Sequence, residues 1–399
     1  MPIHALWLGI SLEIEKPQSR GRIIRGYHIV QRTRLLRFVS KAVAPNQGKV
    51  IRLYWKYALR RTFHVVITYV IITFILSALF NAVMDKTQRT DIRERVQGEV
   101  MAKSSRMTPA ALAAYRDTRM KTLIKQYHLD QPTAFRIFWN ATRTLSFDFG
   151  NATNIRASNG EKKVLTIIAE AMPRTVMLFT LAVLIDIIIG VLIGIKQAQK
   201  PGKPFDRGAT LLTMVVYGLP TWWFAMVLIM LLVYKIGIFP SGGLHTVPPP
   251  EGFAYYLDLL YHMALPVLTL VAVGFWARAY LTRNIVLGTL QEDYIMSARA
   301  RGLPERKVLY GHTMRSAAPP IVTMAALSIL FSIGGGLIFE GIFSWPGMGN
   351  LYWIGVQQND IPVLMGNLAV TILFYLAGIL VLDLIYGLLD PRIKVGGKA

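Results

Sequence analysis

The sequence predicts an all-α protein that crosses a membrane six times. Two observations lead to this prediction: 53% of the 399 residues are hydrophobic, and the charged residues, 17% of the chain, lie mostly outside long apolar runs. A soluble chain of this length is not normally so apolar. A spanning helix needs about 20 mostly apolar residues. Six segments meet that requirement, namely residues 62–83, 175–195, 209–234, 262–281, 321–343 and 364–389.

Particular residues mark these segments. The first begins directly after Arg60 and Arg61. The third contains Pro220 and the fourth has Pro266 near its start, and both are tolerated because neighbouring helices satisfy the freed carbonyl groups. The fifth contains three glycines at 334–336, which permit either close approach of another helix or local unwinding beside a pore. Close packing is the favoured interpretation.

The distribution of Lys and Arg predicts how the chain is oriented. Residues 1–61 hold 13 of these residues, whereas the loops 236–261 and 344–363 hold none. Because basic residues accumulate in cytoplasmic loops, both termini and the loop 282–320 are expected in the cytoplasm. The segment 84–173 must then be external despite its 15 basic residues, since long segments cross largely regardless of charge. The net charge of +22 is thus mostly a topology signal, and nucleic acid is not an expected partner.

These assignments divide the chain into five parts. They are a basic cytoplasmic extension (1–61), a first transmembrane helix (62–83), an extracytoplasmic segment (84–173), a five-helix core (174–390) containing the loop 282–320, and a cytoplasmic tail (391–399). Residues 1–50 form either an amphipathic helix on an anionic leaflet or a basic tail without regular structure. In the extracytoplasmic segment a helix is expected at about residues 108–127.

The chain carries no recognisable motif for catalysis, nucleotide binding or metal binding. It has no cysteine, which excludes disulfides, thiolate metal sites and thiol catalysis. The Gly202-Lys203 pair lacks the upstream glycine of a P-loop and is followed by Pro204. We therefore predict that the protein is not an enzyme, with no catalytic residue, metal site or cofactor of its own.

The polar insert at residues 292–316 predicts a compact pair of short helices that works in water. Gly302 can adopt the left-handed conformation that ends the first helix, and Pro304 suits the first turn of the second. Such an insert is a docking surface for a partner. Arg278 and Arg283, at the end of the fourth apolar segment, are expected to anchor the membrane interface or brace this insert.

Four residues are candidates for a substrate path. Asp186 lies near the middle of the second segment, where a charge costs at least ~2.5 kcal/mol, so it should face the bundle interior, a partner or water. It is either a path or gating group or a structural hydrogen-bonding group. Trp222 and Gly335 are candidates from their positions in the helices. Glu340 either lines an external vestibule or serves in capping or pairing.

Six short motifs follow one another in a fixed order beside the expected segments. They are residues 145–150 (LSFDFG), 219–223 (LPTWW), 239–242 (FPSG), 293–304 (DYIMSARARGLP) followed by His312 and Arg315, 343–349 (FSWPGMG) and 383–393 (DLIYGLLDPRI). In these motifs the chain resembles the B-type permease subunit of dipeptide, oligopeptide and nickel ABC importers. The resemblance covers nearly all of residues 55–393.

The resemblance implies a type I ABC importer permease fold in which the insert is the EAA-type coupling loop. Met296, Ser297 and Ala298 stand at the Glu-Ala-Ala positions before the obligatory glycine, so the glutamate is missing, as is common in the peptide branch. The residues implied to couple to an ATPase are Asp293, Tyr294, Ala298, Ala300, Gly302, Leu303, Pro304, Glu305, His312 and Arg315.

The resemblance further implies a subunit of the bacterial inner membrane that forms half of a translocation pathway. Its implied partners are a homologous C-type permease, two ABC ATPase subunits that hold ATP and Mg²⁺, and an extracytoplasmic substrate-binding protein. Peptide is the default cargo, with nickel, sugars and other solutes left open. An ion-coupled secondary transporter is the alternative, but it would need several polar groups near the bilayer midplane, and Asp186 alone supports it little.

Overall fold

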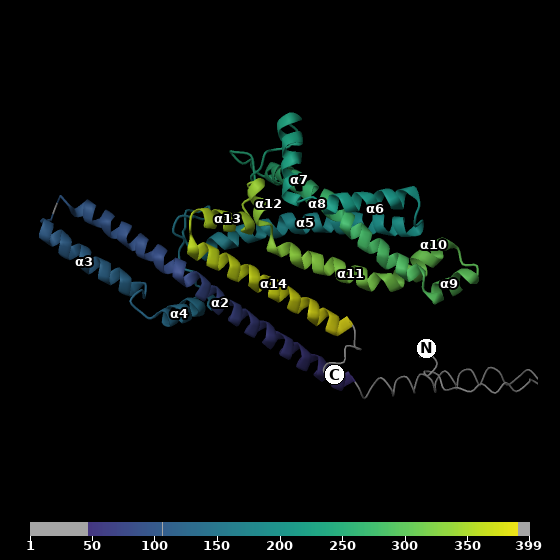
Figure 1. Ribbon diagram of the computed structural model, residues 1–399, viewed down its shortest axis with the longest axis horizontal. Coiled ribbons are helices and arrows are strands. Elements are labelled where there is room, and N and C mark those ends of the chain that lie inside the picture. The colour runs from purple at the N-terminus through teal and green to yellow at the C-terminus, as the bar shows by residue number, and fades with distance from the viewer. Residues whose placement is uncertain (1–46, 106, 390–399) are drawn as a thin grey trace, which may run out of the picture. The chain divides into compact units, whose positions relative to one another are not determined.

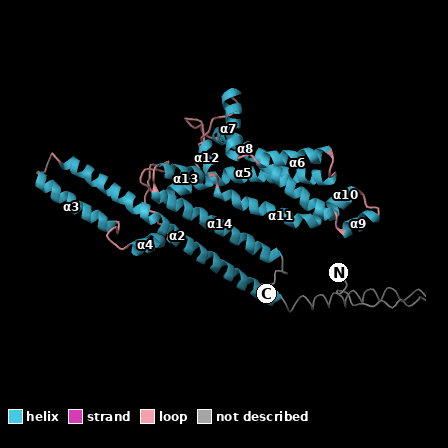
Figure 2. Cartoon of the chain, in the orientation of Figure 1, coloured by secondary structure: helices cyan, strands magenta, loops and turns pink. Residues whose placement is uncertain are grey.

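The computed structural model describes residues 47–105 and 107–389, and these are almost entirely helical (Figures 1 and 2). The elements in chain order are α2 (Gln47–Lys103), α3 (Pro109–Gln126), α4 (Thr133–Leu145), α5 (Val164–Gln199), α6 (Pro204–Tyr217), α7 (Thr221–Leu228), the π-helical η1 (Ile229–Lys235), α8 (Phe253–Leu290), α9 (Asp293–Ala300), α10 (Glu305–Lys307), the π-helical η2 (Val308–Thr313), α11 (Met314–Phe331), the 3₁₀-helical η3 (Ser332–Gly334), α12 (Leu337–Ile342), α13 (Met348–Gln357) and α14 (Ile361–Leu389). Residues 61–386 form one compact unit. The predictions for residues 1–46 and for the tail 391–399 lie outside the described residues.

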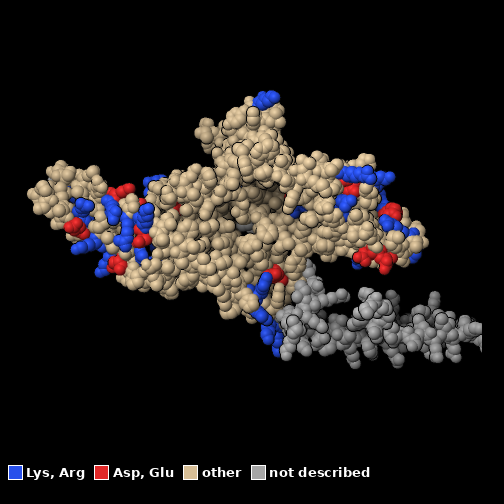
Figure 3. Space-filling model, viewed as in Figure 1, with Lys and Arg blue, Asp and Glu red and all other residues tan. Residues whose placement is uncertain are grey.

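Within the described residues, five helices are long and apolar enough to cross a membrane, and a bent pair makes a sixth candidate. The five are Tyr54–Lys103, Val164–Gln199, Phe253–Leu290, Glu305–Phe331 and Ile361–Gly387. Charged side chains gather over the α2–α3 hairpin and over α9 and α10, and the surface in view between them is largely uncharged (Figure 3). This distribution fits a bilayer around the uncharged part.

The third predicted segment is not one continuous helix, contrary to the expectation for residues 209–234. α6 and the α7–η1 stretch meet at a bend of 98°. Pro220 is the reason, because proline disfavours the helical conformation of the residue before it and has no N–H to donate. Leu219 is accordingly outside the helix, and Pro220 is the N-cap of α7 with φ −61° and ψ 126°.

The fifth predicted segment also differs, since α11 ends at Phe331 rather than near residue 343. η3 follows, and the chain then turns at Gly335, whose φ of 68° and ψ of −171° are accessible essentially to glycine alone. The glycines therefore unwind the helix, the interpretation we did not favour. They also permit close approach, because a Cβ on Gly335 would lie 2.8 Å from Thr175 Cγ2 and one on Gly336 3.0 Å from Phe179 Cζ.

α5 and α8 pack closely against each other through two glycines on α5. A Cβ on Gly190 would lie 2.8 Å from Arg278 Cβ, and one on Gly194 would lie 2.4 Å from the Ala279 carbonyl oxygen and 2.6 Å from Thr282 Cβ. Small residues four apart are the pattern that lets membrane helices approach. The four-residue spacing of this pair is visible in the sequence, but its packing partner on α8 is not.

We expect Gly194→Val to destabilise the protein by about 3 kcal/mol, because its side chain has no room against α8 and overpacking forces the two helices apart. Thermal unfolding of the purified protein in detergent measures the effect. Gly208→Ala on α6 is the matched control, since nothing lies within 4 Å of the added Cβ. Equal unfolding temperatures for both variants would contradict the close α5–α8 contact.

The first helix continues well past the predicted span at 62–83 and pairs with α3. Ile92 and Val96 of α2 form a small buried core with Leu123 of α3 and with Leu129. The helix predicted at 108–127 is confirmed as α3, with Pro109 in its first turn and the Thr108 side chain accepting a hydrogen bond from the Ala111 N–H at 3.4 Å. The segment after the first span is thus a folded helical hairpin.

Candidate functional site

The insert between α8 and α11 folds as the predicted pair of short helices, here called the two-helix knob and defined as residues 293–313. Gly302 has φ 76°, and its N–H donates to the Arg299 carbonyl at 2.9 Å. Leu303 N–H donates to the Ala298 carbonyl at 3.4 Å, which completes the cap of α9. Pro304 precedes α10 as its N-cap. The turn predicted at Gly302 and Pro304 is confirmed.

The two-helix knob packs closely against the ends of two long helices. Ile295 of α9 and Val308 of η2 are fully buried, and they belong to a hydrophobic cluster that includes Ile195 and Ala198 of α5 and Val286 of α8. The Arg299 guanidinium also bonds the Glu305 carboxylate at 2.9 Å, which ties α9 to α10 across the turn. The two-helix knob therefore contacts the ends of α5 and α8 directly.

The residues implied to couple to an ATPase do not all face outward. Ala298 is buried and packs in the cluster under the two-helix knob, whereas Leu303 and His312 are half-buried. The exposed members are Asp293, Tyr294, Ala300, Gly302, Pro304, Glu305 and Arg315. The exposed surface also includes Met296 and Tyr310, which the motif comparison did not single out.

An open pocket of about 610 Å³ lies beside the two-helix knob. It is lined by Gln199, Lys200, Leu290, Arg299, Glu305, Arg306, Leu309 and Tyr310. Its wall combines the end of α5 with α10 and η2, so a partner side chain inserted here would contact a transmembrane helix and the knob at once.

A second candidate site is a buried polar cluster that joins three membrane helices. The Arg278 guanidinium of α8 donates to Asp186 Oδ2 of α5 at 2.8 Å and also bonds Ser328 Oγ of α11. Asp186 is 4% exposed. A Cβ on Gly274 would lie 3.1 Å from the same carboxylate oxygen, so a larger residue there would crowd the charge where it meets α8. Asp186 therefore faces the bundle interior as predicted, and it bonds a residue of another helix.

The expectation that Arg278 anchors the interface or braces the two-helix knob is wrong, because Arg278 is engaged inside the bundle. Arg283 likewise pairs with Asp206 and so links α8 to α6. The pairing of Asp186 with Arg278 could have been predicted from the sequence, because a buried charge requires a partner and Arg278 is an opposite charge in another apolar segment. The buried Asp206 was missed by the sequence analysis.

Glu340 does not line an open vestibule, because its side chain is fully buried. It accepts hydrogen bonds from Thr175 Oγ1 at 2.8 Å and from the backbone N–H groups of Gly349 at 2.8 Å and Asn350 at 3.1 Å. Those N–H groups begin α13, where a carboxylate is stabilised by the helix dipole. Glu340, one of the four candidates for a substrate path, thus caps the N-terminus of α13. Trp222 on α7 is 41% exposed, and Gly335 lies at the helix break beside Thr175.

The packing around the Glu340 cap explains why the motif at residues 343–349 contains Gly347 and Trp345. A Cβ on Gly347 would lie 2.3 Å from Thr175 Oγ1 and 2.4 Å from Glu340 Oε2, so only glycine fits. Trp345 is fully buried and its Nε1–H donates to the Arg174 carbonyl at 3.1 Å. The loop therefore fastens α12 and α13 to α5 at Arg174 and Thr175.

We expect Glu340→Gln to destabilise the protein by about 1.5–3 kcal/mol, because an amide replaces one acceptor oxygen and a buried N–H or hydroxyl loses its charged partner. A lower unfolding temperature in detergent is the readout. Glu251→Gln, in an exposed loop, is the control that should leave the temperature unchanged. If Glu340→Gln unfolds at the wild-type temperature, the cap does not stabilise α13.

Comparisons with known proteins give a consistent result. A family model described as "Binding-protein-dependent transport system inner membrane component" matches residues 186–395. The chain is 30% identical over 271 residues to the oligopeptide transport system permease protein AppB of Bacillus subtilis, covering 68% of this chain and 84% of that protein. It is 32% identical to the dipeptide transport system permease protein DppB of Escherichia coli K12, over 56% and 73% of the two chains. It is also 32% identical to the peptidoglycan transport system permease protein YejB of Agrobacterium fabrum, over 69% and 75%.

Proposed function

The chain belongs to the binding-protein-dependent transport system inner membrane components, and from this premise we propose that it forms half of an ATP-driven import pathway for peptides. It is a multi-pass permease subunit of the inner membrane and not an enzyme. The peptide cargo is supported by the relatives, which are permeases of oligopeptide, dipeptide and peptidoglycan transport systems. With the family shown, an ion-coupled secondary transporter is no longer needed to explain the chain.

The observation that carries the mechanism is the close packing of the two-helix knob against α5 and α8. In this proposal the knob is the EAA-type coupling loop of a type I importer and sits in a groove of an ABC ATPase subunit. When two such ATPases bind ATP and Mg²⁺ and close, the knob moves and drags the ends of α5 and α8 with it. Its exposed residues, among them Tyr294, Met296 and Tyr310, supply the apolar contact.

The remaining partners follow from the same assignment. Binding-protein-dependent transport requires an extracytoplasmic binding protein and an ATPase. We assign the other half of the pathway to a homologous C-type permease. Both termini lie in the cytoplasm in this arrangement, which places the knob there too, as the 13 basic residues of 1–61 favour.

Purification of the chain from its native membrane in mild detergent tests the proposal. We expect stoichiometric recovery of a second permease and of P-loop ATPases, and the reconstituted complex with its binding protein should hydrolyse ATP faster when peptide is added. Recovery of the chain alone or as a homo-oligomer would overturn the assembly. Stimulation by a sugar or by nickel but not by peptide would overturn the cargo.

A further inference from the structure

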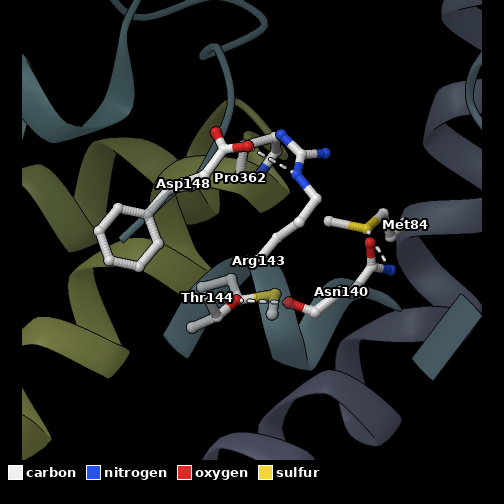
Figure 4. Close-up of a pocket in the computed structure, with 8 residues that line it drawn as sticks. Met84, Asn140, Arg143, Thr144, Asp148 and Pro362 are labelled. Atoms are coloured by element: carbon white, nitrogen blue, oxygen red, sulfur yellow. Dashed lines mark hydrogen bonds and ion pairs between the residues drawn. The ribbon is translucent and has the colours of Figure 1, made fainter. Parts of the chain in front are cut away.

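α4 has the reverse of the amphipathic arrangement expected for a helix in water. Its outward side chains are aromatic: Phe135 is 41% exposed, Phe138 56% and Trp139 40%. The Arg136 side chain turns inward and is only 12% exposed, and Asn140 lies with Arg143 along a small cavity of about 30 Å³ (Figure 4). A helix that faced water would expose the polar groups and bury the rings.

The polar side chains of α4 find partners within the protein. Arg136 bonds Asp85 of α2 at 2.5 Å, and Arg143 bonds Asp148 at 2.9 Å. The Asn140 amide lies 3.4 Å from Met84 Sδ. Because both guanidinium groups are paired with carboxylates of the same chain, the outer face of α4 can enter an apolar environment without leaving these charges unpaired.

Two contacts fix the depth of α4 relative to the first span. Ser77 Oγ of α2 donates to the Ile137 carbonyl of α4 at 2.8 Å, and the rings of Phe74 and Phe138 are 6.0 Å apart. Ser77 lies six residues before the end of the apolar segment 62–83, which at ~1.5 Å per residue is about 9 Å. The middle of α4 is therefore level with apolar helix, not with the charged hairpin beyond it.

At this level α2 exposes the apolar side chains of Ile71, Ile75 and Leu79, as expected for the lipid-facing side of a membrane span. The outward rings of α4 continue that surface through the contact of Phe138 with Phe74. Trp139 also stacks with Phe135, and its ring is 5.0 Å from that of His128. Clusters of amphipathic aromatic rings are typical of the bilayer interface.

We propose that α4 is an interfacial membrane helix, whose Phe135, Phe138 and Trp139 insert into the headgroup and upper acyl region of the leaflet on the α3 side. A depth of about 9 Å agrees with the ~5–10 Å to which such helices bury their apolar face. Lipid is the occupant because the face is continuous with the lipid-facing side of a span and lies at its depth. The helix thereby fixes the position of the α2–α3 hairpin above the membrane surface.

The chain has no cysteine, so single-cysteine variants can be labelled without further changes. Phe138→Cys and, as a second site on the same face, Phe135→Cys would carry a nitroxide spin label in the assembled transporter in lipid nanodiscs. Leu79→Cys on the exposed side of α2 is the lipid reference, and Lys121→Cys on the exposed side of α3 is the water reference. The measurement is the ratio of collisions with oxygen, which enters lipid, to collisions with a water-soluble nickel chelate.

We expect the labels at 138 and 135 to favour oxygen as the label at 79 does, whereas the label at 121 favours the nickel chelate. A ratio at both α4 sites equal to that at 121 would overturn the proposal and place the helix in water. Low collision rates with both reagents would also overturn it, because a protein partner would then cover the face.

Discussion

Replacement of Arg278 by methionine is expected to destabilise the protein by about 3–5 kcal/mol and to abolish uptake. The variant leaves the Asp186 carboxylate buried at 4% exposure without its guanidinium partner and removes the donor to the Ser328 hydroxyl oxygen as well. Breaking one side of a buried ion pair is far more damaging than removing both, since an isolated charge cannot be solvated in the bundle. The unfolding temperature in detergent and the yield of folded protein measure the effect.

The double variant Asp186→Asn with Arg278→Met is the control. It removes both charges, so we expect it to recover most of the lost stability. If the double variant is stable but still transports poorly, the ion pair is needed for movement and not only for folding. If Arg278→Met is as stable as the wild type, the pairing of α5 with α8 through these residues is wrong.

Gly302→Val is expected to lower ATP-driven uptake by about tenfold or more while membrane insertion stays normal. Gly302 has φ 76°, and a residue with a Cβ in that conformation costs roughly 1–2 kcal/mol, more for a β-branched side chain. The turn between α9 and α10 would then rearrange, and the two-helix knob would no longer transmit a push to α5 and α8. Because nothing lies within 4 Å of a Cβ at Gly302, the effect is on the backbone and not on packing.

Peptide uptake in proteoliposomes, with ATP hydrolysis measured in parallel, tests this expectation. Gly302→Asn is the matched control, since asparagine tolerates the left-handed conformation and should retain most of the uptake. Unchanged uptake in Gly302→Val would show that the turn does not transmit coupling. A fall in membrane-inserted protein for Gly302→Val would show a folding role in its place.

Local sequence patterns predicted the parts of this fold that depend on neighbouring residues. Runs of apolar residues located the membrane helices, and Thr108 and Pro109 marked the start of α3. The turn at Gly302 followed from one glycine and one proline, because φ/ψ preferences are local properties. The six motifs predicted the family, which the comparisons then confirmed.

The same patterns did not predict features that depend on contacts between helices, such as breaks in the backbone and the partners of buried side chains. Pro220 and Gly335 are visible in the sequence. The bend at Pro220 and the unwound turn at Gly335 nevertheless depend on neighbouring residues that accommodate the break, such as Thr175 beside Gly335. For Glu340 the sequence left a vestibule role and a capping role open, and the fold decides between them by bringing backbone N–H groups of α13 to the carboxylate.

By itself the sequence determined that this protein is a helical membrane permease with a stiff polar turn between two of its spans. Only the tertiary structure decided that Asp186 meets Arg278, that Glu340 caps α13, and that the aromatic face of α4 points outward. The physical reason is register: Asp186 and Arg278 are 92 residues apart, and the depth at which α5 packs on α8 determines which charges become neighbours.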